Sequence, residues 1–421
     1  MKNILIEQNP HWVGKQQVFV QRDMLDKLIA YLPLRQIITI TGMRRCGKST
    51  LAKLAINHLI ETGIDPKNIL YVNLEQPSFL EVRHDPSYLQ TIYDTYLQLA
   101  DPQGKTYVIF DEIQFFENWQ VFIKSQYEQS GIKFIVTGSN SSMLSNELNT
   151  ILSGRSLNIH LETFSFTEYL TYKEIAYSTE IERVNNRIAI YRARDEYLQW
   201  GGFYEVFTVD APIIKKDILI SYAKNILYQD IIPRYGIRNP EAIERLFFYL
   251  LINVTGVLNY TTLANTFGIS KNTTEEYIRY FEDVFLLKRI DKFHNKPKER
   301  IKSSKKIYAL DNGFLQIAPK HSEDLGKSLE NAVFIKLNQE SEHLSYLKET
   351  YEVDFYTEDA LYQVAYDISA EKTRKRELRS FAYFPQSESK PCRLITYEEN
   401  QDSEEVDIIN VTQFMLPNTK N

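Results

Sequence analysis

The chain has 421 residues, of which 43% are hydrophobic and 25% charged, and its formal net charge is −6. This composition is typical of a soluble globular protein of two to four domains, and the negative total excludes a protein drawn as a whole onto nucleic acid. Two cysteines, Cys46 and Cys392, exclude a disulfide framework or zinc site and fit a reducing cytoplasm. We expect no signal peptide, and no apolar run approaches the ~20 residues of a membrane span.

The first strong motif lies between a β-rich run, residues 37–41, and an apolar helical pattern that starts at residue 49. It reads GMRRCGKS and matches the phosphate-loop pattern G-x-x-x-x-G-K-S in its strand–loop–helix context. Glycines let backbone N–H groups point at phosphate oxygens, and the following helix N-terminus favours an anion. We expect Lys48 to reach the β- and γ-phosphates and Ser49 to place its hydroxyl on Mg²⁺. A chance match on a structural loop is the alternative, and the two correct flanks argue against it.

An acidic pair follows the next strong strand pattern. The apolar run Tyr107–Phe110 predicts a buried parallel strand, and Asp111 and Glu112 come directly after it. Ligands of such sheets bind at the carboxyl ends of the strands. We therefore expect Asp111 to hold the Mg²⁺ shell and Glu112 to act as the general base that polarises the attacking water. The alternative is a solvated acidic strand end.

Two further polar positions are candidates in the same segment. A strand over residues 132–138 ends in Ser139 and Asn140, and a polar residue here can orient water and sense the γ-phosphate, although the stretch is also ordinary turn chemistry. A helix is predicted over residues 141–154. Arg155 then precedes a last core strand, where it is either an arginine finger for a neighbouring subunit or a surface salt bridge.

These motifs resemble a group of bacterial and archaeal AAA-type ATPases with the phosphate loop G-x-R-R-x-G-K-[ST] and a C-terminal domain of unknown function. The resemblance rests on GMRRCGKS (42–49), Asp111-Glu112, TGSN (137–140) and SGR (153–155), with lid-like stretches TFSFTEYL (163–170) and GGFYEVF (201–207). Tyr204 stands where the group usually has proline. The resemblance implies ATP and Mg²⁺ as cofactors. The expected nucleotide contacts are Gly42, Met43, Arg44, Arg45, Cys46, Gly47, Lys48, Ser49 and Thr50.

The middle of the chain is predicted to be helical. Residues 161–235 have helical apolar spacing broken at Gly201-Gly202, which suits a lid over the nucleotide. Helices over 241–253 and 261–268, a turn, and a helix from Lys271 form a helix-turn-helix pattern, with wing strands at 288–293 and 305–311. We therefore expect a winged helix-turn-helix over residues 236–305.

The charges of this region argue both for and against DNA. The expected reading helix offers Lys271, Asn272 and Arg279, but Glu275 and Glu276 repel phosphate. The wing segment 292–306 holds seven basic residues against one acid, Glu299. They are Lys292, Lys296, Lys298, Arg300, Lys302, Lys305 and Lys306. This run would bind phosphates without reading sequence, so DNA is one candidate partner; a solvated loop, with the helices as a packed adaptor, is the alternative.

A hairpin near the C-terminus, YEVDFYTEDALYQVAYDIS (351–369), raises the question of a nuclease. In the resembled group the C-terminal domain resembles a restriction-endonuclease fold, which implies that Glu330 and Asp354 would share a metal, joined by Gln363. Position 365, where a catalytic lysine would lie on the same strand face, holds alanine. We expect no lysine to be fixed beside Asp354, unless Lys372 swings in from its basic segment. The domain is thus predicted to be an inactive nuclease-like fold.

The predicted architecture is an α/β P-loop core at residues 15–160 and a helical lid at 161–235. A winged helix-turn-helix follows at 236–305, and an α+β nuclease-like domain at 306–421. The favoured function is a Mg²⁺-dependent ATPase that acts as a molecular switch or motor with a nucleic-acid or protein partner, and as a candidate homo-oligomer. The alternatives are a nucleic-acid-binding regulator whose ATP only sets conformation and, less favoured, an ATP-coupled nuclease. We expect a cytoplasmic protein without a membrane partner.

Overall fold

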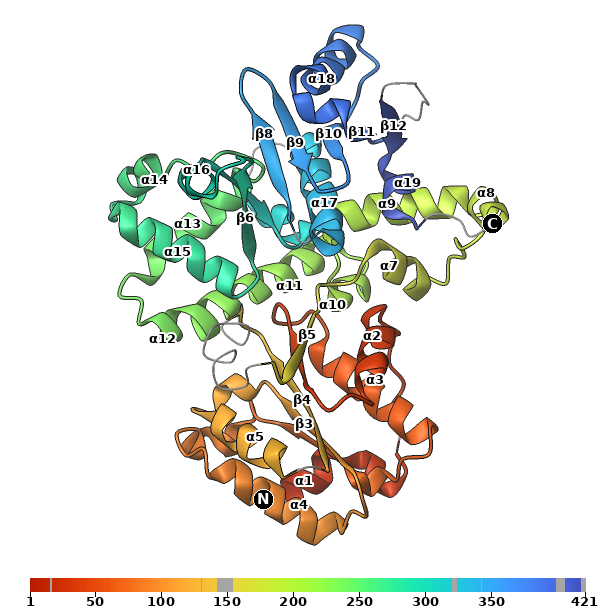
Figure 1. The fold of residues 1–421 in the computed structure, drawn as a ribbon, viewed down its shortest axis with the longest axis vertical. Helices are drawn as coiled ribbons and strands as arrows, with labels where there is room; N and C mark the ends of the chain where they lie inside the picture. Colours follow the sequence, from red (N-terminus) through yellow and green to blue (C-terminus); the bar gives the residue numbers. More distant parts are fainter. Residues whose placement is uncertain are drawn as a thin grey trace. The chain divides into compact units, whose positions relative to one another are not determined.

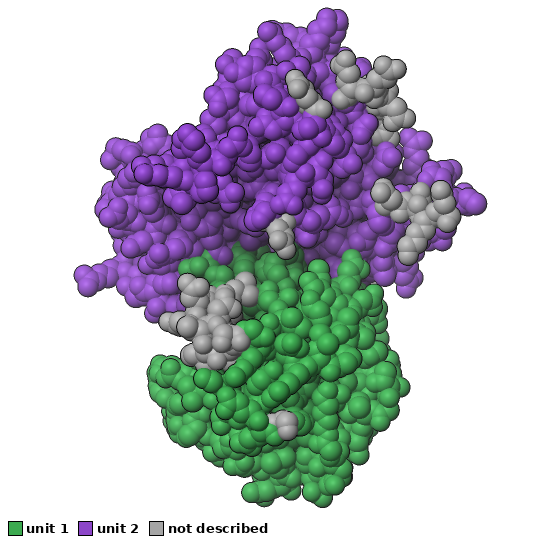
Figure 2. Space-filling model, in the orientation of Figure 1, with its two compact units in different colours: residues 1–162, 283–285 green, residues 163–282, 286–421 purple. Residues whose placement is uncertain are grey.

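The computed structural model describes residues 1–15, 17–129, 131–141, 154–319, 324–341, 343–398 and 406–417. The chain divides into unit 1, Met1–Glu162 with Asp283–Phe285, and unit 2, Thr163–Glu282 with Leu286–Asn421 (Figure 2). Almost all of the helix predicted over residues 141–154 lies outside the described residues. Within the described ranges, none of the helices is long and apolar enough to cross a membrane.

Unit 1 is built on a parallel sheet of five strands in the order β2-β3-β4-β1-β5 (Figure 1). The strands are β1 (Ile37–Thr41), β2 (Ile69–Asn73), β3 (Thr106–Asp111), β4 (Ile132–Gly138) and β5 (Ser156–His160). All neighbouring strands run in the same direction. This confirms the predicted P-loop sheet, and it brings the carboxyl ends of β1, β3 and β4 to one edge.

Helices and apolar side chains bury this sheet. The helices are α1 (Lys2–Gln8), α2 (Met24–Tyr31), α3 (Lys48–Glu61), α4 (Tyr88–Ala100) and α5 (Trp119–Glu128). Every residue of β1 and β3 is buried, as expected for parallel strands covered on both faces. The Phe122 ring lies 6.0 Å from that of Phe110 and 6.3 Å from that of Phe134. Truncating one such ring to alanine typically costs about 3–5 kcal/mol.

Unit 2 contains a mixed sheet of seven strands in the order β12-β11-β10-β9-β8-β6-β7 (Figure 1). The strands are β6 (Leu287–Lys292), β7 (Lys305–Ala309), β8 (Ser345–Lys348), β9 (Glu352–Tyr356), β10 (Leu361–Ala365), β11 (Cys392–Thr396) and β12 (Asp407–Asn410). The three strands β10, β11 and β12 are parallel, and β9 is antiparallel to β10 and β8. The C-terminal α/β region with a mixed sheet is thereby confirmed.

The helices of unit 2 fall into two groups along the chain. Those before β6 are α7 (Phe166–Tyr172), α8 (Glu180–Asn185), α9 (Arg187–Trp200), α10 (Tyr204–Phe207), α11 (Pro212–Asn225), α12 (Ile232–Tyr235), α13 (Pro240–Ile252), α14 (Tyr260–Phe267) and α15 (Lys271–Asp283). Those after β6 are α16 (Pro297–Lys302), α17 (Leu325–Glu340), α18 (Glu371–Tyr383) and α19 (Val411–Met415). The first group covers the segment predicted to be helical.

The expected wing differs from the structure in one respect. Strands β6 and β7 form the antiparallel hairpin that the sequence predicts, after α13, α14 and α15. However, β6 also pairs in parallel with β8, through Asp291 and Lys292 opposite Ser345 and Tyr346. One sheet therefore crosses the expected domain boundary at residues 305–306. Main-chain pairing between segments more than fifty residues apart leaves no local sequence signal, so the pattern alone could not reveal it.

The Gly201-Gly202 break has a specific structural cause. Asp311 is buried, and its carboxylate accepts hydrogen bonds from the Thr163 hydroxyl at 2.7 Å, the Gly202 N–H at 2.9 Å and the Gly313 N–H at 2.8 Å. Gly201 has a φ of 75°, and a Cβ there would lie 1.9 Å from Asp311 Oδ1. The two glycines thus let the end of α9 approach a buried carboxylate.

Candidate functional site

Lys48 lies at the carboxyl edge of the sheet, where β1 leads into the phosphate loop and α3 begins. Its ammonium is 3% exposed and donates to the Gly42 and Met43 carbonyls at 3.1 and 3.0 Å. It also lies 3.2 Å from Glu112 Oε1. Burial alone would lower the pKa of Lys48, but the Glu112 carboxylate outweighs it and holds this pKa above its ordinary value. Lys48 is therefore charged and held at the mouth of the loop.

Close contacts around the loop, with a carbonyl at one position and a guanidinium at another, require its glycines. Gly47 has a φ of 103°, and a Cβ there would lie 2.6 Å from Arg22 Nη1. A Cβ at Gly42 would lie 2.0 Å from the Leu161 carbonyl oxygen. Arg22 itself donates to the Cys46 carbonyl at 2.6 Å and to the Glu162 carbonyl at 2.8 Å. This buried arginine, which the sequence did not single out, ties the loop to the end of unit 1.

Asp111 is held by two hydroxyl groups, one on each oxygen. Tyr71 on β2 donates to Oδ2 at 2.6 Å, and Thr137 on β4 donates to Oδ1 at 2.5 Å. The Tyr71 hydroxyl also forms a hydrogen bond with Ser49, so it joins the two residues predicted to face Mg²⁺. Burial and the Asp111 carboxylate raise the pKa of Tyr71, which keeps it a proton donor. Tyr71 has no local motif and was not found from the sequence.

Glu112 is the most constrained side chain of the site. Its backbone adopts the left-handed conformation, with φ 55° and ψ 49°, which costs a non-glycine residue about 1–3 kcal/mol and is typical of functional positions. Its N–H donates to the Thr137 hydroxyl at 2.9 Å, and its Oε2 accepts from the Gln114 amide. Burial alone would raise the pKa of Glu112, but Lys48 and Gln114 hold it below its ordinary value. The carboxylate is thus ionised and oriented.

The residues present fit a Mg²⁺-nucleotide. Gly42 and Gly47 let the loop backbone fold tightly against Leu161 and Arg22 at the N-terminus of α3, which favours an anion. Ser49 and Asp111 offer the hard oxygen atoms that Mg²⁺ prefers, and Lys48 supplies a charge for phosphate. The donor set is therefore that of a phosphate site with a divalent cation, and not that of an all-protein metal cage.

The other residues predicted to line the loop take different places. Arg44 forms an ion pair with Glu75, which follows β2. Met43 and Cys46 are buried, Arg45 is exposed with a φ of 69°, and Thr50 lies in the first turn of α3. Which of these contact a nucleotide stays a prediction.

The polar turn after β4 and the arginine before β5 lie at opposite ends of the sheet. Ser139 and Asn140 are buried at the carboxyl end of β4, on the edge that carries Lys48 and Glu112. Arg155 precedes β5 at the opposite end of the sheet, where its carbonyl accepts from the first residue of β1 and its guanidinium lies 3.3 Å from Glu128. Arg155 is thus remote from the loop of its own chain by the full length of β1.

A second buried lysine corrects the expectation that no lysine is fixed beside Asp354. Lys306 on β7 is 3% exposed, and its ammonium lies 3.3 Å from Asp354, 3.2 Å from Glu330 and 2.5 Å from Glu352. Tyr308 also donates to Glu330 at 2.8 Å. The expectation was wrong because Lys306 lies in a basic run of the sequence that suggests a surface segment. Successive side chains of a strand point to opposite faces, and the side chain of Lys306 points into the interior of unit 2.

The remaining parts of the expected nuclease site are arranged differently from the prediction. Gln363 donates to Glu377 of α18 at 2.9 Å, and Lys372 of the same helix is exposed. Ala365 is buried. Within the described residues, no group of three or more His, Cys, Asp or Glu side chains is arranged to hold a metal ion. The Lys306 ammonium lies between Glu330 and Asp354, the two acids that were expected to share a metal ion.

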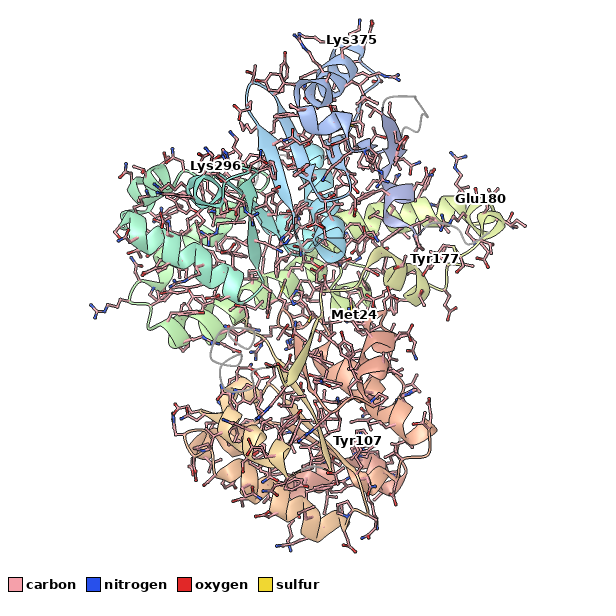
Figure 3. The ribbon with its side chains drawn as sticks, viewed as in Figure 1. Met24, Tyr107, Tyr177, Glu180, Lys296 and Lys375 are labelled. Atoms are coloured by element: carbon pink, nitrogen blue, oxygen red, sulfur yellow. The ribbon has the colours of Figure 1, made fainter. Side chains whose placement is uncertain are left out.

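Ion pairs neutralise much of the basic run 292–306. Lys292 lies 3.1 Å from Glu349, Lys296 3.5 Å from Glu299, and Arg300 3.6 Å from Asp291. Lys305 pairs with Asp291 as well, and Lys306 is buried among acids. Lys296 lies on the surface of unit 2, before α16 (Figure 3). Acidic neighbours therefore lower the positive potential that the linear charge count suggested.

Two family models match parts of the chain. Residues 34–170 match the model of an AAA domain, which covers the phosphate loop, the acidic pair and the polar turn after β4. Residues 191–324 match a domain of unknown function (DUF8612), and this match crosses the boundaries expected at residues 235 and 305. The predicted nuclease relation of the C-terminal segment finds no support in these matches.

Relatives extend over most of the chain. An uncharacterized protein of Haemophilus influenzae is 28% identical over 407 residues, 94% of this chain and 98% of that protein. An uncharacterized protein of Methanocaldococcus jannaschii is 29% identical over 382 residues, 88% and 82% of the two chains.

Two solved structures are similar at low scores. Aeropyrum pernix ORC1 in complex with DNA has 11% identity and a TM-score of 0.32, over 69% of this chain and 90% of that one. AMPPCP-bound DnaA from Aquifex aeolicus has 13% identity and a TM-score of 0.29, over 65% and 92%. Scores this low carry no argument about ligands or partners. The AAA match coincides with the sheet and loop described above, so residues 34–170 have a P-loop fold and are similar to an AAA domain.

Proposed function

We propose that unit 1 binds Mg²⁺-ATP and hydrolyses it to ADP and phosphate. The observation that carries this proposal is the meeting of Lys48, Ser49, Asp111 and Glu112 at one sheet edge, with Lys48 3.2 Å from Glu112. A protein that only binds nucleotide has no need of a buried, left-handed, ionised glutamate beside the loop lysine.

The chemistry follows from the positions of these side chains. Phosphate oxygens compete with Glu112 for Lys48, so nucleotide binding releases Glu112 Oε1 from its ion pair. The attacking water then forms a bond to the γ-phosphorus and gives its proton to Glu112. The bond from the γ-phosphorus to the β–γ bridging oxygen breaks, and its electron pair leaves with ADP. Bound Mg²⁺ would neutralise charge on the phosphates, and Ser49 and Asp111 would hold it.

A lysine substitution tests this proposal. Lys48→Ala should reduce Mg²⁺-ATP affinity by at least about 100-fold while the fold is kept, because the buried ammonium that faces phosphate is lost. Calorimetric titration with a non-hydrolysable ATP analogue measures the affinity, and circular dichroism checks the fold. Lys67→Ala, in the exposed turn before β2, is the matched control. Equal affinity in wild type and Lys48→Ala would refute the site.

We further propose that the ATPase works as a switch or motor with a macromolecular partner. The helix-turn-helix α14–α15 supports a nucleic-acid partner, whereas the paired charges of residues 292–306 favour a protein partner. Arg155 is proposed as a finger in trans only, because the length of β1 separates it from its own loop. Turnover per subunit should then rise with protein concentration, and a concentration-independent rate would reject this role.

A further inference from the structure

Gln114 joins the ends of two strands through one side-chain amide. It lies in the short turn Ile113–Phe115 directly after β3, and its Nε2 donates to Glu112 Oε2 and, at 3.1 Å, to the Ser139 hydroxyl. Glu112 is the proposed general base, and Ser139 ends β4 on the same edge. The amide therefore connects the base with the position predicted to sense phosphate.

The two oxygens of the Glu112 carboxylate have different partners. Oε1 faces the Lys48 ammonium at 3.2 Å, and Oε2 accepts from Gln114. A phosphate that draws Lys48 away frees Oε1 and leaves Oε2 held. Gln114 thus fixes which oxygen is available to take a proton and in which direction it points.

The carbonyl end of the same amide supports this assignment. Gln114 Oε1 is buried and has no hydrogen-bond partner among the described residues. A carboxylate can only accept hydrogen bonds, so the NH₂ group must face Glu112, and the carbonyl cannot exchange places with it. Buried polar atoms are nearly always paired, and an exception in a site is a candidate acceptor for a ligand.

Resting on the proposed ATPase function, we propose that Gln114 is a positioning residue for hydrolysis. It holds Glu112 by Oε2, leaves Oε1 to accept the proton of the attacking water, and offers its own carbonyl as a second acceptor for that water. The charged and titratable groups that interact with Glu112 are Lys48 on α3, Arg44 and Cys46 in the loop, and Tyr71 on β2. Gln114 is the neutral donor among them.

A graded pair of substitutions tests the proposal. Removing the Gln114 hydrogen bond should lower kcat and leave nucleotide affinity nearly unchanged, because Glu112 loses the contact that directs its Oε1 while Lys48 and the loop stay in place. We expect a larger loss of kcat for Gln114→Glu, which places a second carboxyl beside Glu112, than for Gln114→Leu. In both variants kcat at neutral pH should fall by roughly 10–100-fold, less than the ~10²–10⁴-fold that a general base contributes, while affinity for an ATP analogue stays within about 3-fold.

The control separates positioning from packing. Gln126→Leu removes a buried glutamine of α5 that bonds Gln90 at 2.7 Å, so it disturbs unit 1 without touching the site. It should leave both kcat and the affinity for the ATP analogue unchanged. A Gln114 variant that still binds the ATP analogue is folded. If Gln114→Leu does not bind the analogue, the kcat of Gln114→Glu alone tests the proposal. A wild-type kcat in a folded Gln114 variant overturns the inference; a wild type without turnover overturns the proposed ATPase function itself.

Discussion

Each unit contains a buried lysine among acids, and the two lysines differ in what surrounds them. Lys48 in unit 1 meets one carboxylate, Glu112, and two backbone carbonyls, at the mouth of a glycine loop. Lys306 in unit 2 meets three carboxylates within 3.3 Å, one on α17 and two on β9. Both are 3% exposed.

The ion pair of Lys48 can be exchanged for a ligand, whereas the ion pairs of Lys306 are fixed. Carbonyl oxygens bind an ammonium more weakly than charged oxygens do, so an arriving phosphate can replace them and Glu112 at Lys48. At Lys306 the surplus of acids holds the ammonium from several sides. Similar burial of a lysine therefore marks a site in one unit and an internal counter-ion in the other.

The largest effect is expected from breaking the fixed cluster. Lys306→Met should destabilise unit 2 by about 3–5 kcal/mol at neutral pH, because it leaves buried carboxylates without their counter-charge. Urea denaturation followed by circular dichroism measures this loss. Adding Glu352→Gln, which removes the carboxylate 2.5 Å from the ammonium, should restore part of it.

A surface lysine provides the matched control. Lys375→Met on α18, 75% exposed and paired with Glu371, should change stability by less than about 1 kcal/mol (Figure 3). Similar costs for Lys306→Met and Lys375→Met would show that the buried cluster is not held together by Lys306.

A smaller effect is expected from pH. Burial first and the Asp354 carboxylate second raise the pKa of Glu330 to about 7 from its ordinary 4.5. The folded chain thus binds this proton more tightly than the unfolded chain, and the resulting stability is complete below pH 4.5 and lost as the pH rises through about 7. Asp311, raised to about 6 mainly by burial, acts in the same direction.

Glu330→Gln isolates the contribution of that group. The stability of the variant relative to wild type should rise between pH 5 and pH 8, since glutamine has no proton to lose. Urea denaturation at both pH values measures the difference. A gap between variant and wild type that stays constant from pH 5 to pH 8 would show that Glu330 does not titrate in this range.

The sequence predicts those residues of the site that lie close together in the chain, within one motif. The loop glycines, Lys48 and Ser49 follow one strand and open one helix, and Asp111-Glu112 directly follow another strand. A single motif contains all the geometry that such residues need. Gln114 has a weaker signal of the same kind, an amide two residues after the acidic pair, and its partner Ser139 could not be inferred from spacing.

What could not be predicted depends on pairing between distant segments. Tyr71 reaches Asp111 from a neighbouring strand forty residues earlier, and nothing near it in the chain marks it. Lys306 stands in a basic run that reads as surface, but neighbouring residues of β7 point to opposite faces, so Lys305 is partly exposed and Lys306 is buried. The charge of a segment does not show which of its members face the core.

The central claim is that nucleotide and Glu112 compete for Lys48, and Glu112→Gln tests it most directly. The variant removes the competing charge and keeps the shape, so it should bind Mg²⁺-ATP roughly 3–10-fold more tightly than wild type while its turnover stops, as expected for a lost general base. Glu117→Gln, an exposed carboxylate of the same unit, controls for overall charge. Calorimetric titration should show the tighter binding; weaker binding than wild type, or turnover at the wild-type rate, would contradict the claim.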